Sequence, residues 1–249
     1  MTELVRCALE NGLRELTITD HCDLLSMEGT ITLDFDWAPL RTQFLEAKEL
    51  AGDRLRLNYG IELGGASDFP EAADLILREN TDFVLGSVHN LSVSAGCTDF
   101  YDLDYRNNPE LCRSALEDYF ASMERLAAWN GFDSLAHLPY LLRYLRDRDG
   151  MPITLDPWEG RIRAILRTLI RNGKALELNT CRGKSVEDYR GLLRWYRQEG
   201  GALVTLGSDA HDPRDVGKGL REAQLLLKEE GFRSFAIYHK HIPTEIPLD

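Results

Sequence analysis

Seven side chains that can bind a metal ion or form strong hydrogen bonds lie at or just beyond the ends of short apolar segments of this 249-residue sequence. They are His21, Glu62, His89, His137, Asn179, Asp209 and His211. Neutral imidazole and carboxylate groups are together the usual protein ligands of Zn²⁺, Mn²⁺ and Fe²⁺. If the apolar segments are parallel strands, their carboxyl ends share one face, and the sequence predicts a single metal-binding cluster there.

Each of these residues alone is a weak signal, because a histidine after a strand is commonly structural and Asp209 could form a turn. Their joint occurrence is stronger. Four of the six histidines occupy such positions, whereas His239 and His241 lie in the C-terminal tail without such a context. Asp209 and His211 are two residues apart on an extended segment, so both can point to the same side. Glu62 could bridge two metal ions, an arrangement that favours phosphoryl transfer.

Short apolar runs rich in β-branched residues alternate with longer amphipathic segments, a pattern typical of β/α units around a parallel sheet. The predicted strands are 16–19, 55–63, 83–88, 134–137, 175–179, 202–207 and 234–238. The predicted helices are 2–11, 36–51, 70–79, 109–129, 158–172, 186–199 and 218–229. No internal repeat or linker divides these segments, so we expect residues 1–249 to form one domain.

The composition is that of a globular protein, with 43% apolar and 28% charged residues. The sequence has no apolar run as long as a membrane span, no signal-peptide pattern and no Cys-x-x-Cys pair, so we expect a cytoplasmic protein. The net charge of −12 disfavours nucleic acid and anionic membranes as partners, because basic surfaces usually bind both. A small anion can still bind if cations reverse the field locally.

The motifs around the candidate residues are, in chain order, TITDHCD, GIELGG, FVLGSVHNL, DSLAHLPY, ALELNT and VTLGSDAH. In this order they resemble the successive motifs of the polymerase and histidinol phosphatase (PHP) superfamily, across essentially the whole chain. The stretch 99–105 and the tail 231–247 resemble its histidinol-phosphatase branch. The resemblance implies an α/β fold, a distorted (βα)7 TIM-like barrel, with a site for three divalent ions (Zn, Mn or Fe). It also implies that metal-activated hydroxide hydrolyses a small phosphorylated substrate, L-histidinol phosphate, in histidine biosynthesis.

The resemblance also implies a role for each candidate ligand. The implied metal ligands are His21, Glu62, His89, His137, Asp209 and His211. Glu62 would bridge two ions, and His89 and His137 would complete the ligands of the second. Asp209 would bind the first ion, and the two remaining histidines would bind the third. The implied catalytic residues are Glu62, His89, Asp209 and His211.

Binding of the phosphate oxygens requires positive charge near these ligands. Arg182 and Lys184, just beyond Asn179, are candidates, and Arg214 is a third. The planar guanidinium group suits a phosphate well. The same residues are also explained as ordinary solvated loop charges, and the sequence leaves both interpretations open.

One part of the family pattern is absent, namely a first strand carrying His-x-His and a further ligand histidine in the loop after it. The segment 2–11 is already helical, so we expect a barrel without its first β-strand, an exposed edge beside 16–19, and fewer than three bound ions. The chain is either an N-terminally truncated form of an active enzyme or a degenerate member that binds without hydrolysis. We favour truncation, because the remaining ligands are intact, and expect poor turnover.

Two further functions stay open. The chain could be another phosphoesterase of the family that acts on phosphotyrosine or on a nucleotide. It could also be a non-catalytic domain that binds a metal ion or a ligand. The acidic net charge disfavours polynucleotides, and the stretch 99–105 favours histidinol phosphate. The oligomeric state and the native metal are not determined by these motifs.

Overall fold

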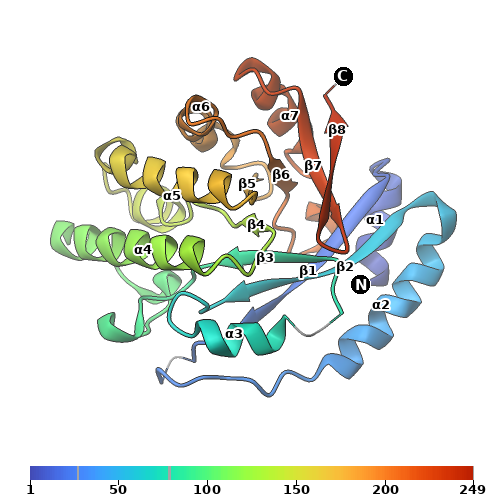
Figure 1. Ribbon diagram of the computed structural model, residues 1–249, viewed down its shortest axis with the longest axis horizontal. Coiled ribbons are helices and arrows are strands. Elements are labelled where there is room, and N and C mark those ends of the chain that lie inside the picture. Colours follow the sequence, from blue (N-terminus) through green and yellow to red (C-terminus); the bar gives the residue numbers. More distant parts are fainter. Residues whose placement is uncertain (27, 78–79, 249) are drawn as a thin grey trace.

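A computed structural model of the chain describes residues 1–26, 28–77 and 80–248. Within these residues, six parallel strands form one sheet in chain order, with the helices arranged around it (Figure 1). The strands are β1 (Glu15–Asp23), β2 (Arg56–Gly64), β3 (Phe83–Ser87), β4 (Ser134–Leu135), β5 (Ala175–Asn179) and β6 (Val204–Gly207). The α/β class with a parallel sheet, predicted from the alternation of segments, is confirmed.

The α-helices follow the predicted segments closely. They are α1 (Thr2–Glu10), α2 (Trp37–Ala51), α3 (Pro70–Ile76), α4 (Pro109–Trp129), α5 (Glu159–Arg171), α6 (Tyr189–Gln198) and α7 (Leu220–Glu229). Helix α4 shows why the sequence sets its bounds: the Asn108 side chain accepts a hydrogen bond from the backbone N–H of Leu111, and Asn130 ends the helix in the left-handed conformation. The end of the predicted helix 70–79 falls on residues 78–79, which lie outside the described residues.

The two larger of three apolar clusters among the described residues hold most of the elements together. The larger one packs α4, α5 and α6 against the sheet, and the smaller one packs α1 and α2 against β1 and β2. Strand β2 is buried along nearly all of its length, although its apolar residues alternate with small and polar ones. The core therefore fixes the middle strands of the sheet on both faces.

The sheet remains open between its first and last strands. Within the described ranges, β1 pairs with β2 alone and β6 pairs with β5 alone. A cavity of about 770 Å³ lies between these two edges, and β1, β6 and the C-terminal strands line it. The sheet is thus a curled half-barrel with a gap between β1 and β6.

The predicted strand 234–238 does form, but its expected place in the barrel is wrong. It is β7 (Ser234–His239), which pairs antiparallel with β8 (Ile242–Pro247), a strand that the sequence analysis did not predict. Lys240 and His241 connect them with φ of 47° and 63°, as a tight two-residue hairpin turn requires. The hairpin packs against the sheet through Ala236 and Tyr238. None of the helices among the described residues is long and apolar enough to span a membrane.

Candidate metal centre

Strands β1 and β2 place His21 and Glu62 side by side. The two residues are partners in the parallel register, near the carboxyl ends of both strands. The sequence predicted that His21 follows a strand ending at residue 19, and this is wrong. Strand β1 continues to Asp23, because its polar second half pairs with β2 as regularly as its apolar first half. His21 is therefore held within the sheet.

Glu62, His89 and His137 form a buried group that we call the inner cluster. His89 and His137 each lie two residues beyond a strand, β3 and β4, and β4 is shorter than the predicted 134–137. Oε1 of Glu62 lies 2.9 Å from Nε2 of His89 and 2.9 Å from Nε2 of His137. The two Nε2 atoms are 3.3 Å apart. All three side chains are buried.

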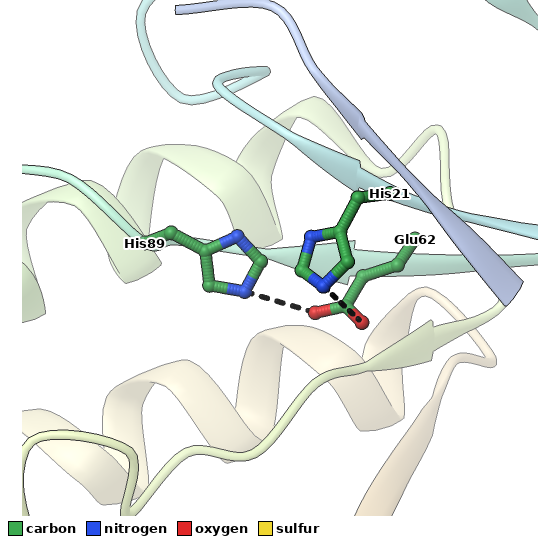
Figure 2. Close-up of side chains that lie close together, drawn as sticks. All are labelled: His21, Glu62 and His89. Atoms are coloured by element: carbon green, nitrogen blue, oxygen red, sulfur yellow. Dashed lines mark ion pairs between the residues drawn. The ribbon is translucent and has the colours of Figure 1, made fainter. Parts of the chain in front are cut away.

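The inner cluster and His21 suit a divalent ion. Figure 2 shows His21, Glu62 and His89 pointing toward one another, and each offers a ligand atom within 4.8 Å of the others. With Zn–N distances of 2.0–2.1 Å, two nitrogen ligands of one tetrahedral zinc lie roughly 3.3 Å apart. The Nε2 atoms of His89 and His137 have this separation. Two imidazoles around one carboxylate oxygen are a donor set that zinc, manganese and iron accept.

Protonation in the inner cluster follows from burial and hydrogen bonds. Burial would raise the pKa of Glu62, but hydrogen bonds with His137 and His89 lower it well below its usual value. Burial would lower the pKa of His89, but hydrogen bonds with Asp23 and Glu62 raise it to about 10. Burial lowers the pKa of His137. Without a metal, a proton on His89 therefore offsets the Glu62 charge, and a cation that binds there displaces this proton.

His21, Asp209 and His211, which we call the outer group, are less enclosed. The side chains of His21 and His211 are 46% and 61% exposed. Nε2 of His21 lies 3.9 Å from Oε2 of Glu62, and Nδ1 of His211 lies 3.4 Å from Oδ1 of Asp209. The inner cluster and the outer group nevertheless line one cavity of about 480 Å³. The six ligands predicted from the sequence are thus brought together.

Arg143 lies in the same cavity, and the sequence analysis missed it. A single π-helical turn, Arg143–Arg148, carries it, and such turns are frequent at functional sites. Its guanidinium donates to Oδ2 of Asp209 at 2.7 Å and to Oδ1 of Asn179 at 2.8 Å. The available signal was its position in the loop after the strand that leads to His137, because such loops lie at the carboxyl edge of the sheet.

The predicted phosphate-binding residues divide into two sets. Arg182 and Lys184 line the cavity, and Nε of Arg182 is buried without a hydrogen-bond partner among the described residues. Asn179 is buried beside them and binds Arg143. Arg214 is not brought to the cavity: its side chain is 85% exposed and pairs with Asp212 at the start of the same short turn.

Two carboxylates support the ligand histidines from behind. Oδ1 of Asp23 accepts from Nδ1 of His89 at 3.0 Å, and Oδ2 accepts from Nδ1 of His21 at 3.1 Å. Glu177, a buried acid to which the sequence assigned no role, accepts from the backbone N–H of His137 at 2.7 Å. Burial raises the pKa of Glu177 to about 8. Asp23 was missed because the predicted strand ended before His21, so the sequence did not indicate that His21 and Asp23 lie on the same face of one strand.

The chain is similar to curated histidinol phosphatases along nearly its whole length. It is 29% identical over 239 residues to a probable histidinol-phosphatase of Thermotoga maritima, covering 94% of this chain and 86% of that protein. It is 27% identical over 237 residues to the histidinol-phosphatase of Lactococcus lactis subsp. lactis, covering 93% and 85%.

A solved structure agrees with these sequences. The crystal structure of histidinol phosphate phosphatase from Lactococcus lactis, complexed with zinc, L-histidinol and phosphate, superimposes with a TM-score of 0.80 at 25% identity, covering 97% of this chain and 91% of that one. The PHP domain matches residues 1–181, which is more than half of the sequence. The ordered motifs, the parallel half-barrel and these similarities agree, and the chain therefore belongs to the PHP domain family.

Proposed function

We propose that this chain is a metal-dependent phosphomonoesterase that hydrolyses L-histidinol phosphate to L-histidinol and phosphate. The observation that carries the proposal is the convergence of one carboxylate and two buried imidazoles in a cavity rimmed by arginines, in a chain similar to histidinol phosphatases. The similar Lactococcus lactis enzyme is complexed with zinc, L-histidinol and phosphate, which are the metal and the two products of this reaction. A role in histidine biosynthesis, in the cytoplasm, belongs to the same proposal.

The inner cluster and the outer group are the proposed metal ligands, for zinc, manganese or iron and for up to three ions. Divalent ions held there would lower the pKa of a water molecule and offset the charge of the phosphoryl group. Glu62 supplies the buried negative charge that attracts them, because its hydrogen bonds keep it ionised. His89 accepts or releases the proton that accompanies metal exchange, since Asp23 and Glu62 raise its pKa to about 10.

Positive side chains in the cavity are proposed to bind the phosphate. Arg143, Arg182 and Lys184 line it beside the carboxylates of the site, so bound divalent ions would add the positive charge that an anion needs in a chain of net charge −12. Asn179 orients the guanidinium of Arg143, whose planar donors match the oxygens of a phosphate. The buried, unpaired Nε of Arg182 is a second donor available to a ligand.

A substrate panel tests this function. The purified chain, loaded in turn with zinc and with manganese, is assayed with histidinol phosphate, phosphotyrosine and a nucleoside monophosphate. We expect the highest kcat/KM for histidinol phosphate and its loss in His89→Ala. Faster hydrolysis of phosphotyrosine or the nucleotide would favour another phosphoesterase of the family. If neither the unmodified chain nor His89→Ala hydrolyses any of the three substrates, a binding domain is favoured.

We also propose that a further parallel strand fills the gap between β1 and β6 and completes a (βα)7 barrel. The two flanking strands have free edges in the described part of the sheet, and the cavity between them has a volume of about 770 Å³. Oδ2 of Asp20 is buried at this cavity without a hydrogen-bond partner among the described residues. The family pattern places a His-x-His strand here, next to the outer group.

Adding this strand to the chain tests the proposal. Asp20 and His21 line the gap beside Leu4 of α1, so a strand placed there would lie next to the metal ligands. A His-x-His strand fused before Met1 is compared with the same strand carrying Ala-x-Ala. We expect more bound metal and a higher kcat in the His-x-His fusion than in the Ala-x-Ala fusion. Equal metal content in both fusions would contradict a strand that carries ligands.

A further inference from the structure

One carboxylate contacts two of the proposed metal ligands at once. Asp23 lies 3.0 Å from Nδ1 of His89 and 3.1 Å from Nδ1 of His21, through its two separate oxygens. We propose that Asp23 is a positioning residue that fixes the tautomer and the ring orientation of both histidines, and that Gly64 is required beside it. This inference rests on the metal-binding part of the proposed function.

The tautomer argument follows from the chemistry of the groups. An ionised carboxylate can only accept hydrogen bonds, and each oxygen of Asp23 lies within hydrogen-bond distance of one imidazole nitrogen. Both Nδ1 atoms must therefore carry a proton. In a neutral imidazole this leaves the lone pair on Nε2, the nitrogen that faces Glu62 in both rings. Asp23 thus leaves both Nε2 lone pairs directed toward Glu62.

The sheet explains how one carboxylate reaches both rings. His21 and Asp23 are two residues apart on β1, so their side chains share a face of the strand. Their partners on β2 are Glu62 and Gly64, also two residues apart. His21 and Glu62 face each other in one register pair, and Asp23 lies beside a glycine in the next. The Asp23 side chain therefore extends across β2 toward His89.

Gly64 leaves the space that this path requires. A Cβ atom at position 64 would lie 2.0 Å from Oδ1 of Asp23 and 3.6 Å from Nδ1 of His89. Real side chains never approach so closely, so any other residue would displace the carboxylate that holds His89. Gly60, on the same strand, is also crowded, but by the methyl groups of Thr17 and Thr19 and by the backbone carbonyl of Phe83. It offers a matched control because none of these nearest atoms belongs to Asp23 or to a metal ligand.

Zinc affinity, measured by competition with a chelator, tests the role of Asp23 without an activity assay. Asp23→Asn keeps the shape, but its amide can accept from one Nδ1–H and must offer N–H to the other imidazole. We expect the zinc affinity to fall about 10- to 100-fold, the usual effect of losing such a supporting group. In ¹H–¹⁵N spectra of the zinc-loaded protein, we expect two slowly exchanging Nδ1–H signals, of which Asp23→Asn loses at least one. Unchanged affinity and both signals would overturn the proposal.

A double-mutant cycle tests the role of Gly64. We expect Gly64→Ala to lower the zinc affinity as Asp23→Ala does. In a chain that already carries Asp23→Ala, Gly64→Ala should lower the zinc affinity little further, because both changes remove the same contact. Gly60→Ala should lower stability and leave zinc affinity unchanged. Fully additive losses from positions 23 and 64 would overturn the link between them. Normal zinc binding by the unmodified chain without phosphatase activity would instead count against the proposed function.

Discussion

The inner cluster and the outer group are built from the same residue types, but the fold encloses them differently. Strands β2, β3 and β4 each have a neighbour on both sides, and they carry or lead into the inner cluster. The outer group comes from β1 and from the segment after β6, the two edges of the open sheet. Donor atoms lie 2.9–3.3 Å apart in the inner cluster, whereas His211 lies 3.4 Å from Asp209 within the outer group and His21 lies 3.9 Å from Glu62.

This difference shows that a metal site is as well fixed as the strands that support it. Buried strands with two neighbours hold side chains in one place, whereas edge strands leave one side open. We therefore expect the inner cluster to bind a metal ion in the chain as it stands. The outer group should depend on what fills the gap between β1 and β6.

The largest expected effect is the loss of the carboxylate at the centre of the inner cluster. Glu62→Gln removes the charge shared by His89 and His137. We expect kcat/KM to fall on the order of 10³-fold, at least the cost of losing one main transition-state stabiliser. Bound zinc should fall as well. Glu230→Gln is the control, since Glu230 is buried but pairs with Arg194 far from the cavity. Equal zinc content in both variants would contradict this central role.

Arg143 lies in the cavity that both parts of the site line, and its removal should have the next largest effect. It holds Asp209 of the outer group and is expected to bind phosphate. We expect Arg143→Ala to lower kcat/KM about 10²-fold. Arg143→Lys should recover only part of the lost kcat/KM, because an ammonium group lacks the planar donors of a guanidinium group. Arg146→Ala, on the same π-helical turn but paired with Asp188, should change little. Similar losses in the Arg143 and Arg146 variants would point to the turn as a whole.

The elements that the sequence predicted well are those with a strong local signal. Helix 109–129 was predicted to its bounds, because Asn108, Pro109 and a regular apolar stripe mark it. Strand 175–179 was also predicted to its bounds, as a short apolar run. The ligand residues could be found because they follow such runs and match an ordered family pattern.

The elements that were missed are set by tertiary contacts. The polar half of β1 is a strand only because β2 pairs with it, and that extension hid Asp23. The π-helical turn that carries Arg143 has no periodicity to detect. Strand β8 is exposed over most of its length and carries Pro243 and Pro247, so its sequence looks like a tail until β7 pairs with it.

His211 offers the sharpest test of the comparison between the two parts. It is predicted to be catalytic, yet its side chain is 61% exposed and lies beside the gap. We expect His211→Ala to lower kcat/KM by no more than about 10-fold in this chain, below the 10²-fold typical of a fully positioned group. In the fusion that supplies a His-x-His strand, the same substitution should cost more. A loss as large as that of Glu62→Gln in the unmodified chain would show that the open edge does not weaken the outer group.

The smallest expected effect lies at the opposite end of the sheet, where the comparison predicts stability without activity. His241, in the turn between β7 and β8, pairs through Nδ1 with Oδ2 of the buried Asp133 at 2.8 Å, and that oxygen also accepts from the N–H of Val84. His241→Ala should lower the free energy of unfolding by about 1 kcal/mol, because Asp133 keeps its second bond. Lys240→Asn should raise it by up to about 1 kcal/mol, since asparagine tolerates the left-handed conformation that Lys240 adopts. Urea unfolding measures both changes, and kcat/KM should stay constant. A fall in kcat/KM with either variant would mean that this end of the strands also positions the metal ligands, so that enclosure alone does not decide which residues carry the chemistry.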